Sequence, residues 1–177
     1  MQIDILKTGQ ENFLLLANTA NGQSLTAEQM TIGAPVAYAD ETGVNPRNTE
    51  VTISALVGSL EYKGSQTLRY TRLALADLLT GYEFQSTEES TIEDVLAKVI
   101  SDLGLVASDV ELVETVMPEW DDGTIDEETS PMTLRAVEGS YLYIGDGTVT
   151  VVEPIDGRER FSTLYAVQDL DGFTTAE

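Results

Sequence analysis

The residues of this chain that are best suited to chemistry form one acidic cluster in its second half. Its members are Glu119, Asp121, Asp122, Asp126, Glu127 and Glu128. Asp121, Asp122 and Asp126 lie beside Gly123, and carboxylates in a glycine-containing loop are the oxygen ligands that calcium prefers. Their spacing departs from the EF-hand pattern. We therefore expect a solvated acidic loop, with calcium binding as the alternative.

Most other enzyme chemistry is excluded by residue types that the chain lacks. It has no histidine and no cysteine, which excludes a Ser-His-Asp triad, a Cys-His dyad, a zinc finger and a disulfide framework. Its 31 acidic residues make carboxylate pairs inevitable, so pairing alone does not indicate a glycosidase. The glycine-rich stretch 58–64 lacks the spacing of a phosphate-binding loop. We expect no enzymatic activity and no cofactor.

The formal net charge of -22 limits the partners of the chain. Nucleic-acid binding draws most of its affinity from Lys and Arg that neutralise phosphates, and an acidic surface is repelled by anionic membranes too. The longest uninterrupted apolar run, residues 13–17, is far shorter than the roughly 20 residues that span a bilayer. We expect a soluble product that binds neither nucleic acid nor membrane.

Two stretches of the chain repeat each other. Residues 51–67 align without gaps on residues 132–148, which lie 81 positions later. Seven positions are identical: Thr52 with Thr133, Ala55 with Ala136, Gly58 with Gly139, Ser59 with Ser140, Tyr62 with Tyr143, Gly64 with Gly145 and Thr67 with Thr148. Such self-similarity indicates a duplicated structural unit. Two unrelated stretches that share common turn chemistry are the alternative.

Helix signals upstream of these stretches recur 82 positions apart. Ser or Thr three residues before Glu or Gln is the pattern of a capping box, which begins a helix. Such pairs are Thr8 with Glu11, Ser90 with Glu93, Thr26 with Gln29, and Ser108 with Glu111. Gly22 and Gly104 follow apolar periodic stretches and predict left-handed helix ends. A one-residue deletion in the loop at 38–49 would change the offset from 82 to 81.

Each copy predicts one helix followed by three mainly antiparallel strands. The strands are expected at 30–38 and 110–117, and in hairpins at 51–70 and 132–151, where apolar and polar residues alternate. The predicted fold class is α+β, built from two pseudo-repeats of about 81 residues. The first repeat is residues 1–82, and the second is residues 83–177 with a C-terminal extension. We expect one pseudo-symmetric unit, because each copy is small for a core of its own.

The predicted hairpin turns combine glycine with tyrosine. Positive φ angles or bulges are expected at the turn glycines, which are Gly58, Gly64, Gly139, Gly145 and Gly147. Tyr62 and Tyr143 are expected to pack across the strands, with exposed ligand-stacking tyrosines as the alternative. A last apolar set, Phe161, Leu164, Tyr165 and Val167, predicts a further strand or short helix.

The order of short motifs in the first copy resembles a group of virion structural proteins of tailed bacteriophages. These motifs are Asn21-Gly22, Ser24-Leu25-Thr26 with Gln29, Gly33 with Pro35, Arg47-Asn48-Thr49, Tyr62 with Gly64, and Tyr70 with Arg72. The match covers residues 12–75 well and the second copy loosely. In the second copy Leu103-Gly104 replaces Asn-Gly, and Glu128-Thr129-Ser130 stands where Asn-Thr would be expected. Its partner surface is therefore expected to differ.

The resemblance implies a non-enzymatic component of a phage particle, present in multiple copies. It would decorate or connect other virion proteins, such as major capsid or tail components, by protein–protein contacts. It would be made in the bacterial cytoplasm and end in the virion. A carbohydrate-binding module with exposed aromatic residues and a carboxylate-based, glycosidase-like enzyme are the alternatives.

Overall fold

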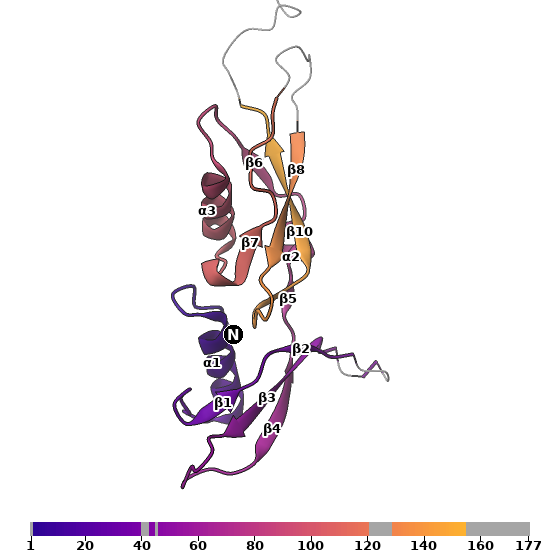
Figure 1. The fold of residues 1–177 in the computed structure, drawn as a ribbon. Coiled ribbons are helices and arrows are strands. Elements are labelled where there is room, and N and C mark those ends of the chain that lie inside the picture. Colours follow the sequence, from indigo (N-terminus) through magenta and orange to yellow (C-terminus); the bar gives the residue numbers. More distant parts are fainter. Residues whose placement is uncertain (1, 40–42, 45, 121–128, 155–177) are drawn as a thin grey trace, which may run out of the picture.

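The computed structural model describes residues 2–39, 43–44, 46–120 and 129–154. Two halves lie end to end in an elongated molecule, each with one long helix beside a largely antiparallel sheet (Figure 1). The fold is α+β, as the sequence predicts. The acidic residues Asp121, Asp122 and Asp126 and the apolar set at 161–167 lie outside the described residues.

The first half consists of one helix and a sheet that is centred on β3. In chain order its elements are α1 (Gly9–Asn21), β1 (Met30–Ile32), β2 (Val36–Ala37), β3 (Thr49–Ala55) and β4 (Ser65–Tyr70). Both β1 and β2 pair antiparallel with β3, and β4 pairs with its other side. The single strand expected at 30–38 is therefore two short strands. Pro35 lies in the break between them and has no N–H to donate to the sheet.

The second half contains more helices and strands than the first, because the chain between the two repeats packs onto it. In chain order they are β5 (Leu73–Ala74), α2 (Leu75–Leu78), β6 (Glu83–Gln85), α3 (Ile92–Leu103), η1 (Ala107–Asp109), β7 (Val110–Leu112), β8 (Thr129–Ala136), β9 (Tyr143–Ile144) and β10 (Asp146–Val152). The sheet order is β6-β10-β8-β7, and β5 pairs parallel with β9. We call residues 71–85 the linker; its β5, α2 and β6 all pack on the second half.

The register of the two hairpins confirms the repeat. Thr52 of β3 lies opposite Thr67 of β4, and Thr133 of β8 lies opposite Thr148 of β10, which are the positions that the sequence alignment equates. On the other side, Ala55 lies opposite Met30, and Ala136 lies opposite Val110. Each helix is thus followed by the same three-stranded arrangement.

The loops that close the two hairpins also match hydrogen bond for hydrogen bond. We call residues 56–64 the first loop and residues 137–145 the second loop. Ser59 Oγ accepts from Tyr62 N–H at 3.2 Å in the first loop, and Ser140 Oγ accepts from Tyr143 N–H at 3.1 Å in the second. The expected left-handed glycines are present in both, with φ of 84° at Gly64 and 71° at Gly145. Gly147, in contrast, lies inside β10 without a positive φ.

The first predicted capping box and both helix ends are confirmed, and the second box is displaced by one residue. Thr8 and Glu11 cap α1, and Gly22 and Gly104 end the two helices in the left-handed conformation. The box that begins α3 is Thr91 with Asp94, so the prediction of Ser90 with Glu93 is wrong. Ser90 Oγ instead accepts from Thr87 N–H at 2.8 Å, which closes the turn before the helix.

The shorter pair of predicted caps does not begin helices. Gln29 Oε1 accepts from Thr26 N–H at 2.9 Å, but this bond closes a turn before β1. Ser108 lies within η1, and its hydroxyl donates to Asp109 at 3.1 Å, so it does not form a box with Glu111. The strand pairing shows that the repeat spacing changes at two places. One is the loop at 38–49, and the other lies between the helix and the first strand of each repeat.

The two halves differ most in their cores. Among the described residues, the core of the second half contains thirteen buried apolar side chains, whereas that of the first contains Phe13, Val51 and Tyr70. The linker supplies Leu75, Leu79 and Phe84 to the second core. The expectation for tyrosine is correct for Tyr143, which is 0% exposed, and wrong for Tyr62, which is 41% exposed. No segment of the described chain covers the first loop as the linker covers the second.

Candidate functional site

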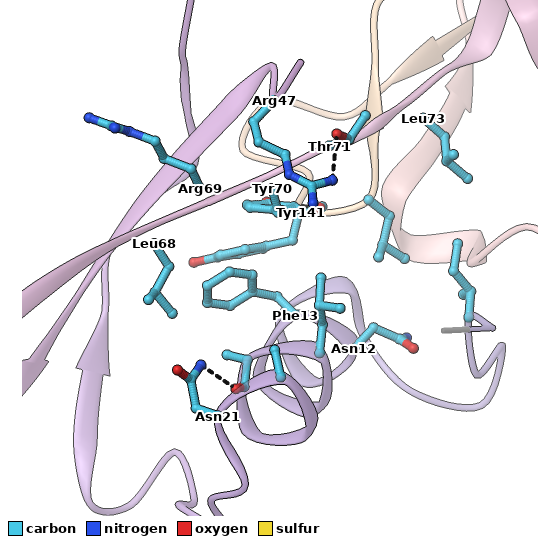
Figure 2. Close-up of a pocket in the computed structure, with 15 residues that line it drawn as sticks. Asn12, Phe13, Asn21, Arg47, Leu68, Arg69, Tyr70, Thr71, Leu73 and Tyr141 are labelled. Atoms are coloured by element: carbon cyan, nitrogen blue, oxygen red, sulfur yellow. Dashed lines mark hydrogen bonds between the residues drawn. The ribbon is translucent and has the colours of Figure 1, made fainter. Parts of the chain in front are cut away.

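Three aromatic rings join the two repeats. The ring centroid of Phe13 on α1 lies 5.1 Å from that of Tyr70 on β4 and 5.6 Å from that of Tyr141 in the second loop (Figure 2). The hydroxyl of Tyr70 donates to the carbonyl of Tyr141 at 2.9 Å. The hydroxyl of Tyr141 donates to the carbonyl of Gly33 at 3.0 Å. The tip of the second repeat therefore docks into the core of the first.

Burial raises the pKa of both tyrosine hydroxyls at this junction. It raises the pKa of Tyr70 well above its usual range, although the nearby charge of Arg72 acts in the opposite direction. It also raises the pKa of Tyr141, against the lowering effect of a hydrogen bond from Gln10. Both hydroxyls are protonated at neutral pH, as their roles as donors require.

A polar cluster beside the rings is built from motifs that the sequence analysis singled out. Asn48 binds both backbone groups of Arg72: its Oδ1 accepts from N–H at 2.8 Å, and its Nδ2 donates to the carbonyl at 2.9 Å. The guanidinium of Arg72 donates to Thr49 Oγ1 at 2.8 Å and to the carbonyl of Ser140 at 2.9 Å. Burial lowers the pKa of Arg72. Asn48, Thr49, Tyr70 and Arg72 thus hold the second loop in place.

Asp109 is a second contact between the repeats. Asp109 is 6% exposed, and its carboxylate accepts from the hydroxyl of Ser140 at 2.7 Å. It lies against Gly9 at the start of α1, where a Cβ would overlap Asp109 Oδ2. The amino end of a helix carries a partial positive charge, which favours a carboxylate there. The sequence analysis identified neither Asp109 nor Tyr141 as a contact residue. The available signal for Tyr141 was its repeat position, because the equivalent residue in the first loop, Leu60, is also apolar.

A cavity of about 400 Å³ opens beside the aromatic rings, between α1 and β4. Figure 2 shows Phe13, Tyr70 and Tyr141 on its wall with Arg47 close by. Arg47 Nη1 donates to Thr71 Oγ1 at 3.4 Å. Apolar and aromatic walls with amide and guanidinium groups suit an apolar side chain of a partner or a sugar ring. The lining residues of this cavity include no carboxylate to act as a general acid or base.

The remaining motif residues shape the backbone of the first repeat. Asn21 Nδ2 donates to the carbonyl of Ala17 at 2.8 Å, next to the left-handed Gly22. Gly33 N–H donates to the carbonyl of Thr52 at 2.9 Å, and a Cβ on Gly33 would lie 3.0 Å from that oxygen. These residues are required by the fold and do not form a separate ligand site.

A second exposed surface lies at the free end of the first half. Val57 and Leu60 in the first loop are 105% and 102% exposed, and Leu56 and Tyr62 are also exposed. The loop forms the lower tip of the molecule in Figure 1. Contiguous apolar residues on a surface mark sites of protein contact.

The described part of the chain offers neither a metal cluster nor a membrane-spanning helix. It contains no group of three or more Asp or Glu residues that could hold a metal ion, and the calcium candidates Asp121, Asp122 and Asp126 are not in that part. None of its helices is long and apolar enough to cross a membrane.

Sequence and structure comparisons place the chain in a family without assigning it an activity. No curated protein and no solved structure matches it. A family model matches residues 3–177, so the chain belongs to the family described as Family of unknown function (DUF7941).

Proposed function

We propose that the chain is a non-enzymatic structural component of a tailed-phage virion, which decorates or connects other virion proteins. The observation that carries the contact role is the exposed apolar first loop, with Val57 and Leu60 wholly in solvent. A monomeric protein rarely leaves such a patch uncovered. The phage context rests on the motif order of the first repeat, from Asn21-Gly22 to Arg72.

The charge of the chain supports the same proposal. A net charge of -22 keeps copies soluble and apart until a matching surface recruits them. The partners would be major capsid or tail proteins, and the site of residence the particle, after synthesis in the bacterial cytoplasm.

Quantitative mass spectrometry of purified particles from the phage that encodes the chain tests this function. We expect the protein at a fixed copy number relative to the major capsid or tail protein, retained after nuclease treatment and a salt wash. Its absence from the particles, with the protein found free in the lysate, would contradict the proposal. The position in head or tail follows from the density of the assembled particle.

A carbohydrate-binding module is the second candidate, and the cavity beside Phe13, Tyr70 and Tyr141 is the observation that favours it. Aromatic walls with nearby amide and guanidinium donors are compatible with a sugar ring. Binding on a glycan array that is lost in Tyr70→Ala, with the fold retained by circular dichroism, would support this candidate.

A further inference from the structure

In the second half, β6 lies between the long helix and the outer edge of the hairpin. It pairs in parallel with β10, where Thr150 N–H donates to the carbonyl of Tyr82 at 3.1 Å. Its central residue Phe84 lies opposite Val151 and is buried in the second core. The hydroxyl of Tyr82 donates to Asp102 Oδ2 on α3 at 2.9 Å. This segment therefore contacts both the strand and the helix.

The corresponding space of the first half is a cavity in the described chain. We call it the α1–β4 groove. The hairpin register equates residues 69–71 of β4 with residues 150–152 of β10, which pair with β6. Residues 69–71 all line the cavity of about 400 Å³, and Ala17 of α1 lies on its opposite wall (Figure 2). The groove is thus the place that β6 fills in the second half.

The outer edge of β4 presents backbone groups to this groove. Ala55 N–H donates to the carbonyl of Gly64 at 3.0 Å, and every second residue from there along β4, including Tyr70, faces β3. Arg69 and Thr71 alternate with these residues, so their N–H and C=O groups point outward. In the described chain β4 pairs only with β3. An exposed strand edge of this kind accepts an added strand.

The described residues before α1 do not take the place of β6. Residues 2–8 form no strand, although they precede α1 as β6 precedes α3. Asp4 N–H donates to Asn12 Oδ1 at 2.8 Å, which holds this segment at the start of the helix. Ile3 packs against the core of the second half without pairing with β4. The described part of the chain therefore leaves the edge of β4 open.

The walls of the groove indicate which side chains fit it. Phe13 and Tyr70 form an aromatic wall, which suits an aromatic side chain at the position that Phe84 takes in the second half. The lining residues include no Asp or Glu, although the chain has 31. Arg47 Nη1 donates to Thr71 Oγ1 at 3.4 Å, so a guanidinium lies at that end of the groove and favours an acidic residue there.

We propose that the α1–β4 groove binds an extended segment of a partner protein, which adds as a strand parallel to β4. The segment places an aromatic residue against Phe13 and Tyr70, and an acidic residue next to it near Arg47. Main-chain donors and acceptors beside an apolar wall favour such a strand over a sugar ring. The inference rests on the proposed function for the identity of the partner, which would be another virion protein.

A peptide that carries this pattern provides the first test. Its sequence is that of residues 80–88 with the change Gln85→Glu. Labelled with fluorescein and titrated with the purified full-length chain, it should show a saturable rise in fluorescence anisotropy. The same peptide with Phe84→Ala should bind at least about tenfold more weakly, because it lacks the buried ring. Absence of saturation at about 1 mM of the chain, or equal binding of both peptides, would overturn the proposal.

Backbone methylation of the peptide tests strand addition without changing the protein. In the chain, Ser86 N–H donates to the carbonyl of Val152 at 3.1 Å, whereas the N–H of Gln85, which alternates with it, points away from β10. N-methylation of the peptide at Ser86 should weaken binding at least about tenfold, and N-methylation at position 85 should leave it nearly unchanged. Equal effects at the two positions would contradict pairing with β4.

A matched pair of protein variants locates the peptide. Ala17→Phe places a ring in the groove, and we expect at least about tenfold weaker binding of the peptide. Thr19→Phe is the control, because it adds the same ring to an exposed residue of α1 that does not line the groove. Circular dichroism checks that both variants are folded. Equal binding by the two folded variants would place the peptide elsewhere and overturn the proposal.

Sedimentation velocity separates a partner protein from a second copy of the chain. We expect the peptide to leave the oligomeric state of the chain unchanged. Dissociation of self-associated chains by the peptide would assign the groove to a second copy and contradict the proposal. The particle experiment is independent of these tests. Peptide binding by a protein that is absent from particles would refute the virion role alone, and presence in particles without peptide binding would refute the groove contact alone.

Discussion

Gly9 and Asp109 come from different repeats and share one small space. Gly9 is the first residue of α1, and Asp109 closes η1 just before β7. The carboxylate reaches the helix start only because Gly9 has no side chain. Its bond with Ser140 ties the second loop to the same point. The absence of a Cβ at Gly9 therefore sets the distance between the repeats.

Gly9→Ala is expected to destabilise the protein. Alanine normally stabilises a helix relative to glycine by about 0.5–1 kcal/mol. Here the new methyl group would displace Asp109, and overpacking typically costs about 1–3 kcal/mol. We expect a net loss of stability, measured as a lower midpoint of urea unfolding. The control Thr19→Ala, on the exposed face of the same helix, should leave the midpoint unchanged or slightly higher. A Gly9→Ala midpoint above that of the parent would contradict the contact.

At the scale of elements, the hairpins and helix ends follow from the sequence, and the contacts between repeats do not. Gly22, Gly104, Gly64 and Gly145 mark turns that local backbone sterics decide, so their positions were predictable. The exposure of Tyr62 was not predictable, because it depends on whether another segment lies over the loop. The same holds for the docking of Tyr141 on Phe13, which joins residues far apart in the chain.

The linker shows a second reason why the sequence does not predict every element of the fold. The sequence predicts a helix as the first element of the second repeat, yet β6 precedes α3 and pairs with β10, and Phe84 is buried in the second core. A strand of three residues is too short to produce a periodic signal. Element boundaries read from sequence are commonly wrong by one or two residues. The start of α3, which lies at Thr91 and not at Ser90, is one example, and the break of the predicted strand at Pro35 is another.

Gly64→Val and Gly145→Val are expected to lower thermal stability, since both glycines have positive φ and a β-branched residue there is strained. A strained position of this kind costs about 1–3 kcal/mol. We expect the larger loss for Gly145, because its loop is packed between the repeats whereas the first loop can relax in solvent. Lys63→Val, beside Gly64 but without a positive φ, is the control. Melting temperatures of both glycine variants equal to that of the parent would contradict a requirement for glycine.

The start of α3 predicts a dependence of stability on pH. Hydrogen bonds from the side chain and backbone of Thr91 lower the pKa of Asp94 below its usual range. A carboxylate with a lowered pKa stabilises the fold above its unfolded pKa, and this stability disappears as pH falls through the folded pKa. Asp94→Asn should therefore melt at a lower temperature than the parent at pH 7, and the difference should shrink as the pH falls through the folded pKa of Asp94. Glu93→Gln, one residue away and outside the box, is the control. A constant difference across this pH range would show that the charge of Asp94 is not involved.

At the scale of the whole molecule, the two halves are alike in backbone but differ in charge and core. The second half carries 23 of the 31 acidic residues and also the larger core, which the linker completes. The four ion pairs among the described side chains are at least partly exposed to solvent, so they contribute little. Repulsion among acidic groups therefore opposes folding, mainly in the second half, and the apolar core outweighs it.

Salt should therefore stabilise this protein. Raising NaCl from about 0.01 M to about 0.5 M shortens the Debye length from about 30 Å to less than 10 Å and screens the repulsion among unpaired carboxylates. We expect the melting temperature to rise over this range, and MgCl₂ at equal ionic strength to raise it by a similar amount, since screening does not require a site. A melting temperature that falls with salt would show that favourable ion pairs outweigh the repulsion. A much larger rise in CaCl₂ than in MgCl₂, abolished by Asp121→Asn with Asp122→Asn, would instead assign a calcium site to the acidic cluster.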